Sequence, residues 1–275
     1  MKKLIVLAAL ALTLSVQAAD VTITTGAQGL TYNGVYGPNL AAALSEFGNK
    51  VAVVTSKGSI DNLDKVASGQ AQFGFTQADA YMFWRSKNAN AAQNVDISGE
   101  LGQECVFVAV KDGGKIEDAG DLKEGAKIAV GDPTSGSYAS WSYLQTLISD
   151  YAKVQTFNKG GDRSLAKVLT GEYDAFLWVA AKDKPNKFLT AVIQKDSGLK
   201  LIKMSTWSVN NKLPNGEQVY TKETAVTQKH TFSDDDIDVP CTKTLVVGNV
   251  NAGDDVLDSV AGIMLKNRAR IIGDK

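Results

Sequence analysis

Short apolar runs alternate along the chain with segments in which apolar residues recur every three or four positions. Residues 51–55 and 175–179 are almost entirely apolar, which is typical of strands buried in a parallel sheet. Leu40, Leu44 and Phe47 fall on one face of a predicted helix that a glycine ends. Because strands and helices alternate over most of the chain, the pattern predicts an α/β fold with mostly parallel sheets covered by helices.

Two predicted strands run into a loop of small polar residues that leads into a helix. The first segment is VTITTGAQGLTY at residues 21–32, and the second is KIAVGDPTSGSY at residues 127–138. The first turn of a helix has unpaired backbone N–H groups and the positive end of the helix dipole, and both suit an anion. Gly and Thr also occupy such turns for steric reasons alone, so one loop by itself is weak evidence.

The segments that follow these loops also repeat. Residues 63–73 read LDKVASGQAQF and residues 165–175 read LAKVLTGEYDA, with Leu, Lys, Val and Gly at equal spacing. Each copy comes after a strand and a turn rich in Gly and Ser. Two copies of one plan predict two similar lobes whose loops face each other.

The remaining segments predict fewer regular elements. Residues 87–98 are polar and rich in Asn and Ala, and they predict a surface connection before a strand at 105–110. Residues 210–229 are polar and contain proline and glycine, and they predict a surface loop with a poor helix. A strand at 239–247 and a helix at 254–270 complete the predicted elements.

Residues 1–18 predict a secretory signal peptide. They contain two lysines, an apolar run too short to span a bilayer, and small residues before a cleavage point after Ala18. Cleavage would leave 257 residues (275 − 18) with a formal charge of −3, because two of the 29 basic residues and none of the 30 acidic ones are removed. We therefore expect a periplasmic protein, and the mild acidity without a basic run argues against nucleic acid.

The few cysteine and histidine residues limit the chemistry of the chain. Cys105 and Cys241 are the only cysteines, and in an oxidising compartment they predict either one disulfide or two buried free thiols. His230 is the only histidine, so no metal site and no cofactor are expected. No set of catalytic residues can be assembled from the sequence, which argues against an enzyme.

Four motifs together resemble the TAXI family of substrate-binding proteins, the extracytoplasmic receptors of one branch of TRAP transporters. They are TTGAQGLTY, TSKGSIDNLDKVASGQAQFGFTQAD, KIAVGDPTSGSY and LAKVLTGEYDAFLW, in the family's order over about residues 21–201. The resemblance implies the type II periplasmic binding protein fold, with two lobes that are each a mostly parallel sheet flanked by helices. On the element order, residues 19–110 and 205–275 form lobe I and residues 111–204 form lobe II.

The resemblance also implies a ligand site between the lobes. Hydroxyl and N–H groups at helix starts can satisfy a carboxylate without a buried counter-charge, which would be costly to desolvate in an empty site. N-capping explains two of the serines, at positions 59 and 137, equally well. Carried over position by position, the implied ligand residues are Thr25, Gln28, Thr31, Tyr32, Ser59, Gln77, Thr134, Ser135, Gly136 and Ser137.

Two further residues have alternative interpretations. Lys57 is either a solvated surface lysine or the partner of a second anionic group on the ligand. Trp178 forms either the apolar wall of the pocket or a packing contact between the lobes. Gln28 and Lys57 replace small residues that are usual in the family, so the ligand need not be the family's usual one.

The resemblance implies a periplasmic receptor that closes its lobes on a small carboxylate and delivers it to a membrane TRAP permease, and we expect it to be a monomer. Glutamate-like amino acids, 2-oxo acids and dicarboxylates are the ligands it implies. Two alternatives remain open at this point. One is a receptor of the same fold for a sulfonate or phosphonate in an ABC system, and the other is a ligand-sensing subunit of a receptor kinase.

Overall fold

The computed structural model describes residues 20–181, 186–204, 211–229 and 234–274. The predicted signal peptide and His230 lie outside these residues. The elements in chain order are β1 (Val21–Thr24), η1 (Tyr32–Tyr36), α1 (Gly37–Ser45), β2 (Val51–Val54), α2 (Ser59–Ala67), β3 (Phe73–Gln77), α3 (Ala78–Lys87), η2 (Ala91–Asn94), β4 (Val95–Lys111), η3 (Ala119–Asp121), β5 (Lys127–Ala129), α4 (Gly136–Leu147), η4 (Tyr151–Lys153), β6 (Gln155–Phe157), α5 (Asp162–Leu169), β7 (Ala175–Ala181), α6 (Lys187–Ile193), β8 (Leu199–Leu201), β9 (Tyr220–Lys229), β10 (Asp234–Asn249) and α7 (Asp254–Ile272).

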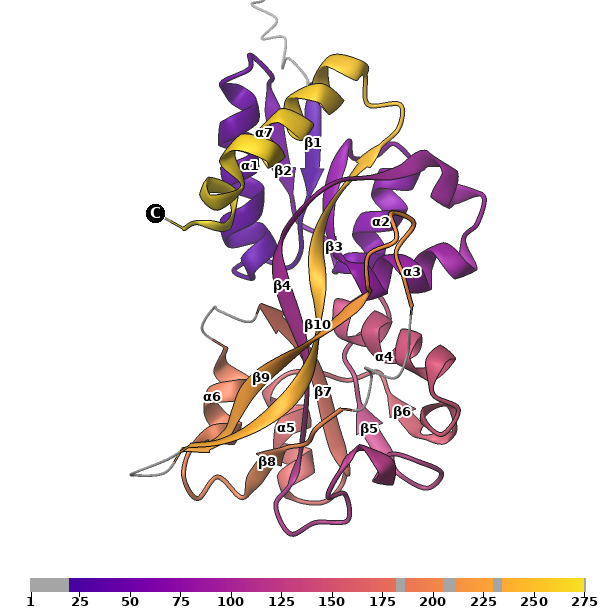
Figure 1. Ribbon diagram of the computed structural model, residues 1–275, viewed down its shortest axis with the longest axis vertical. Coiled ribbons are helices and arrows are strands. Elements are labelled where there is room, and N and C mark those ends of the chain that lie inside the picture. The colour runs from indigo at the N-terminus through magenta and orange to yellow at the C-terminus, as the bar shows by residue number, and fades with distance from the viewer. Residues whose placement is uncertain (1–19, 182–185, 205–210, 230–233, 275) are drawn as a thin grey trace, which may run out of the picture.

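One mixed sheet runs through both lobes of the molecule. Its strand order is β2-β1-β3-β10-β4-β7-β5-β6, with β8 paired to β4 and β9 paired to β10. Strands β1, β2 and β3 are parallel to one another, as are β5, β6 and β7. The long antiparallel strands β4 and β10 lie between these two sets and pass from one lobe to the other (Figure 1). The predicted α/β fold, with two lobes of mostly parallel strands flanked by helices, is confirmed.

The two repeated sequence segments adopt the same local structure in the two lobes. Helices α2 and α5 are each followed by a glycine with positive φ, Gly69 at 74° and Gly171 at 78°. After each glycine the chain turns back along the sheet. The backbone N–H of Gln72 then donates to a carbonyl of β1, and that of Asp174 donates to a carbonyl of β5, both at 2.9 Å. The equal spacing seen in the sequence therefore reflects two equivalent strand–helix–strand units.

Three strands differ from the prediction. Strand β4 begins at Val95, inside the segment predicted as a surface connection, and β10 extends beyond residues 239–247 at both ends. The segment predicted as a loop with a poor helix contains strand β9 instead. Its sequence, YTKETAVTQK, places Thr and Val among charged residues and so favours a strand. It is polar because β9 lies at an edge of the sheet and pairs only with β10.

Strand β9 and the first part of β10 pack against the second lobe. Ala225 of β9 and Ile237 of β10 belong to the same apolar cluster as Phe188 and Leu189 of α6. The lobe boundaries at residues 110 and 205 stay a prediction, and the second of them lies outside the described residues. Besides the long strands β4 and β10, strand β9 joins the lobes: Leu213 and Val219, which precede it, pack in the same cluster as Trp84 of α3, and β9 runs from there into the second lobe (Figure 1).

Helix α1 starts without a kink at its proline. Pro38 occupies the first turn, where the missing N–H has no intrahelical acceptor to lose. The chain enters α1 from the π-helical turn η1, whose Tyr32 and Tyr36 rings pack around Phe75 of β3 at centroid distances of 5.5 and 6.0 Å. This packing fixes Tyr32 at the end of the first loop.

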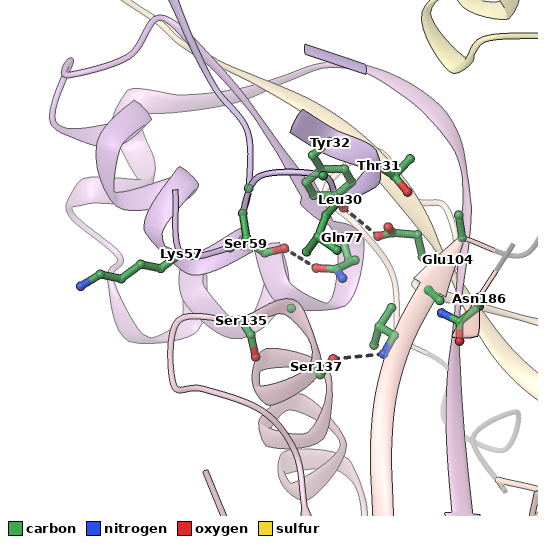
Figure 2. A pocket seen from close by; sticks show the side chains of 18 residues that line it. Leu30, Thr31, Tyr32, Lys57, Ser59, Gln77, Glu104, Ser135, Ser137 and Asn186 are labelled. Atoms are coloured by element: carbon green, nitrogen blue, oxygen red, sulfur yellow. Dashed lines mark hydrogen bonds between the residues drawn. The ribbon is translucent and has the colours of Figure 1, made fainter. Parts of the chain in front are cut away.

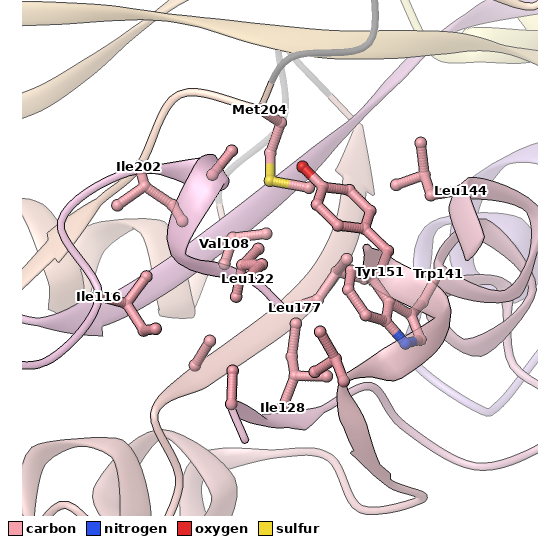
Figure 3. Packing of buried hydrophobic residues seen from close by; sticks show 14 of the residues in the cluster. Val108, Ile116, Leu122, Ile128, Trp141, Leu144, Tyr151, Leu177, Ile202 and Met204 are labelled. Carbon is pink, nitrogen blue, oxygen red and sulfur yellow. The ribbon is translucent and has the colours of Figure 1, made fainter. Parts of the chain in front are cut away.

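An apolar core in the second lobe holds the start of α4 (Figure 3). The Trp141 ring of α4 stacks on Tyr151 with ring centroids 5.1 Å apart, and its Nε1 donates to Thr156 Oγ1 at 2.9 Å. Val108 and Leu177, from β4 and β7, pack in the same cluster. Because α4 is fixed in this way, the loop that precedes it has a defined position relative to the sheet.

Asn62 joins helix α2 to strands β1 and β3. Its fully buried side chain accepts a hydrogen bond from Thr24 Oγ1 at 2.8 Å and donates to the carbonyls of Thr25 and Phe75 at 2.5 and 2.7 Å. We expect Asn62→Ala to lower the free energy of unfolding by about 2 kcal/mol, because these buried groups lose their partner. Urea denaturation measures this loss. The control is Asn251→Ala at an exposed site, where a change within about 0.5 kcal/mol is expected; equal losses in the two variants would contradict the prediction.

Candidate functional site

A cavity of about 320 Å³ lies where the two lobes meet. Figure 2 shows its lining side chains converging from the first-lobe loops, the start of α4 and strands β4 and β7. The predicted ligand residues that line it are Thr31, Tyr32, Lys57, Ser59, Gln77, Ser135, Gly136 and Ser137, and the other lining residues are Gly26, Ala27, Gly29, Leu30, Gly58, Glu104, Val179, Ala180, Ala181 and Asn186.

Four predicted residues do not line this cavity. Thr25 is fully buried and its hydroxyl donates to Val54 O at 2.8 Å, so it holds β1 to β2. Gln28 is exposed to solvent. Thr134 contributes a carbonyl to the contact between the lobes. Trp178 is 3% exposed and stacks on Phe107 at 5.5 Å within the apolar cluster of the second lobe, because its place in the strand turns it toward that core.

The first-lobe side of the cavity is formed by the start of α2 and the end of β3. The Ser59 hydroxyl donates to Gln77 Oε1, and both side chains are almost completely buried. Ser59 is the first residue of α2, where a helix offers no acceptor for the backbone N–H. Its N–H group and the positive end of the helix dipole are therefore placed to meet an anion at this wall.

The second-lobe side is formed by the start of α4. Ser135 caps this helix by accepting from the N–H of Tyr138 at 3.2 Å. The Ser137 hydroxyl accepts from the N–H of Val179 at 3.0 Å, which ties the helix start to β7. Gly136 and Ser137 occupy the first helical positions, so their N–H groups lack an acceptor within the helix. The two walls thus present the same chemistry to the cavity.

The lobes touch each other beside the cavity, so this structure is a closed arrangement. The N–H of Ile60 donates across the interface to Thr134 O at 3.2 Å. Gly58 sits so close to the second lobe that a Cβ there would lie 2.9 Å from Ser135 Cα, and its φ of 132° also requires glycine. A Cβ at Gly136 would overlap the Gln77 side chain. Small residues at both loops therefore allow this close approach.

Glu104 lies at the cavity and was not predicted. It is on β4, in register with Ala181 of β7 and Thr242 of β10, and its side chain is buried. The Tyr32 hydroxyl donates to Glu104 Oε2 at 2.7 Å. Burial raises the pKa of Glu104 to about 7; the hydrogen bond from Tyr32 opposes this rise and the nearby carboxylate of Asp79 adds to it. Burial also raises the pKa of the Tyr32 hydroxyl well above its usual value, with a further contribution from Glu104.

Asn186 is the second lining residue with a polar side chain that sequence reasoning missed. Its Oδ1 caps α6 by accepting from the N–H groups of Phe188 and Leu189 at 3.0 and 2.9 Å. The group that it can offer to a ligand is therefore its side-chain NH2. In the sequence, an asparagine before an apolar segment indicates a helix cap and nothing more. For Glu104 a signal existed: a lone acid stands directly before the apolar run at residues 105–110.

Lys57 is one of the residues that line the cavity, but its side chain points away from the other labelled side chains in Figure 2. The Lys57 N–H donates to Asp61 Oδ2 at 2.9 Å. Its pairing with a second anionic group stays a prediction.

The described part of the chain contains neither a metal-binding cluster nor a membrane-spanning helix. Among the described residues, no group of three or more His, Cys, Asp or Glu side chains is arranged to hold a metal ion. In the same part of the chain, no helix has the length and apolar character needed to cross a bilayer.

Comparison with known proteins identifies the fold and the family of this chain. The structure is similar to the substrate-binding protein of an amino acid ABC transporter, with 14% identity and a TM-score of 0.53 over 89% of this chain and 91% of that one. It is also similar to the GluR0 ligand-binding core from Nostoc punctiforme in complex with L-glutamate (11% identity, TM-score 0.52, 93% and 100% of the chains). A third relative is the arginine-, lysine-, histidine-binding protein ArtJ from Geobacillus stearothermophilus (14%, 0.50, 89% and 89%).

At these identities the likeness shows the fold, which is that of the type II periplasmic binding proteins. Among curated proteins, none matches the sequence. A family model describing the NMT1-like family matches residues 23–267. Since this match spans nearly all of the chain, the protein belongs to the NMT1-like family.

Proposed function

We propose that this protein is a periplasmic solute receptor that captures a small carboxylate between its lobes and delivers it to a membrane TRAP permease. The observation that carries the proposal is the cavity between the lobes, into which the first turns of α2 and α4 and their serines converge. A carboxylate there would accept hydrogen bonds from both lobes at once. Binding would then favour the closed arrangement, because only that arrangement brings both sets of donors to the ligand.

The donor groups support a carboxylate over an apolar solute. The main-chain N–H groups at the starts of the two helices and the NH2 of Asn186 are all donors, and the dipoles of both helices favour negative charge. The cavity volume of about 320 Å³ suits a molecule of amino-acid size. Two of the similar structures are the GluR0 ligand-binding core in complex with L-glutamate and the arginine-, lysine-, histidine-binding protein ArtJ. Both support a solute of the amino acid class.

The transporter partner has a second candidate. The TRAP permease rests on the resemblance to the TAXI family, whereas one structural relative is the substrate-binding protein of an ABC transporter. We expect deletion of a TRAP permease encoded beside this protein to abolish uptake of the bound solute. Uptake that survives this deletion and is lost on deletion of an ABC permease would contradict the TRAP assignment.

The proposed ligand class is tested by thermal unfolding of ligand-stripped protein with amino acids, 2-oxo acids, dicarboxylates, sulfonates and phosphonates. At one hundred times its Kd, a ligand of the native state adds about 2.7 kcal/mol of stability, which raises Tm by about 5–10 °C for a chain of this size. We expect such a rise with a carboxylate and a smaller one in Ser137→Ala. The exposed Ser45→Ala is the matched control and should keep the full rise. A rise with sulfonates or phosphonates alone would refute the carboxylate assignment.

A further inference from the structure

Glu104 is a buried carboxylate on the wall of the cavity, and the donor groups described above do not account for it. It projects from the middle of β4, a strand that passes through both lobes, so its position is fixed by the sheet. One of its oxygens accepts from Tyr32, and the side chain is 6% exposed. Among the described residues, no lysine or arginine forms an ion pair with it. A buried carboxylate facing a cavity without a basic partner is costly unless the ligand supplies one.

We propose that Glu104 forms the subsite for an ammonium group, so that the solute is an amino acid or another zwitterion. This inference rests on the proposed carboxylate-binding function and narrows its ligand class. The cavity then has two ends of opposite character. In Figure 2, Glu104 lies across from Ser59 and Ser135, which mark the starts of the two helices. A carboxylate at the helix starts places an α-ammonium group within the space that Glu104 faces.

The charges around Glu104 favour a cation at this end. A second buried carboxylate, Asp79, lies close enough to raise the pKa of Glu104. Asp79 itself accepts from Tyr220 at 2.8 Å and from the N–H of Ala80 at 2.7 Å, so its oxygens have partners within the protein. The Lys57 side chain runs away from this region in Figure 2. A 2-oxo acid or a dicarboxylate would bring further oxygens toward Glu104, and repulsion would then require a protonated Glu104.

The ionisation of Glu104 should make the ligand affinity depend on pH, in a direction that can be measured. The groups around it are the Tyr32 and Tyr36 hydroxyls from η1, the Asp79 carboxylate from α3, and the uncharged register partners Ala181 and Thr242. An ammonium group binds the ionised carboxylate. With a pKa of about 7, the ionised fraction rises from roughly one tenth at pH 6 to roughly nine tenths at pH 8. The affinity for an amino acid should therefore rise about tenfold over this range. A dicarboxylate that needs protonated Glu104 should show the opposite trend.

Calorimetric titration of wild-type, ligand-stripped protein with matched probes tests the inference. The probes are L-glutamate, 2-oxoglutarate and glutarate, together with L-leucine and its 2-oxo acid, each at pH 6 and pH 8. We expect at least one amino acid to bind at least tenfold more tightly than its 2-oxo acid, and to bind more tightly at pH 8. Glu104→Gln should remove that preference and the pH dependence while 2-oxo acid binding remains. Gln keeps an oxygen that can accept from Tyr32, and circular dichroism checks its fold.

The outcomes separate the two proposals. If the 2-oxo acids or glutarate bind as tightly as the amino acids to the wild type at pH 8, or if the amino acids bind more tightly at pH 6 than at pH 8, the ammonium subsite is refuted and carboxylate binding stands. An amino acid preference that persists in Glu104→Gln also refutes it. If none of these acids nor any other carboxylate binds, the proposed function itself falls, and the subsite with it. The wild-type pH series needs no variant, so the inference remains testable if Glu104→Gln fails to fold.

Discussion

Removing the disulfide between Cys105 and Cys241 is expected to lower the free energy of unfolding by about 4 kcal/mol. The two cysteines face each other on β4 and β10, and both are fully buried. Their sequence separation is 136 residues, and the loop between them contains every element from β5 to β9. The bridge therefore joins the two ends of a loop that contains the parallel strands β5, β6 and β7 of the second lobe. In the unfolded chain it restrains this very large loop.

Urea denaturation of the double variant Cys105→Ala/Cys241→Ala, compared with the wild type, measures this contribution. Wild-type protein unfolded in the presence of a reductant is the matched control for the bridge alone, because it keeps both sulfur atoms. Reductant should destabilise the wild type by most of the same amount and leave the double variant unchanged. A double variant within about 1 kcal/mol of the wild type would contradict the prediction. A thiol assay on unfolded, unreduced protein should likewise find no free thiol.

Local regularity explains why much of the fold could be predicted. The two strand–loop–helix segments, at residues 21–45 and 127–147, carry their signal in consecutive residues: an apolar strand, small loop residues and a helical period. Gly69 and Gly171 end helices at matching places in both copies, because only glycine adopts their positive φ without strain. Ser59 and Ser137 line the cavity because they stand in the first turns of α2 and α4. The position of a residue at a helix start follows from its neighbours in the sequence.

The parts that could not be predicted depend on contacts between distant residues. Glu104 reaches the cavity only because β4 continues from one lobe into the other, and its hydrogen bond to Tyr32 spans 72 positions. Strand β9 is polar, and its pairing with β10 and the packing of Ala225 beside α6 stabilise it as a strand. Trp178 has the composition of a pocket wall, yet it stacks on Phe107 and Phe176 in the core. For these residues the partner decides the role, and the partner is far away in the sequence.

Glu104→Gln is expected to raise the free energy of unfolding of the ligand-free protein by about 3 kcal/mol at pH 8 and to change it little at pH 4. Burial raises the pKa of Glu104 from its ordinary value of 4.5 to about 7 in the folded protein. Between these two values the folded state holds the proton and the unfolded state releases it. Stability of the wild type therefore falls as pH rises through this window, and the loss is complete above pH 7. Glutamine does not ionise, so the variant avoids this loss.

Urea denaturation of the ligand-free wild type and variant at pH 4, 6 and 8 measures the difference between them. The exposed Glu124→Gln is the matched control for the same chemical change, and its difference from the wild type should stay small at every pH. A difference for Glu104→Gln that does not depend on pH would show that Glu104 titrates at its ordinary pKa. The same carboxylate that destabilises the ligand-free protein above pH 7 is the group that would bind a ligand's ammonium. The ligand would therefore restore the stability that ionised Glu104 removes.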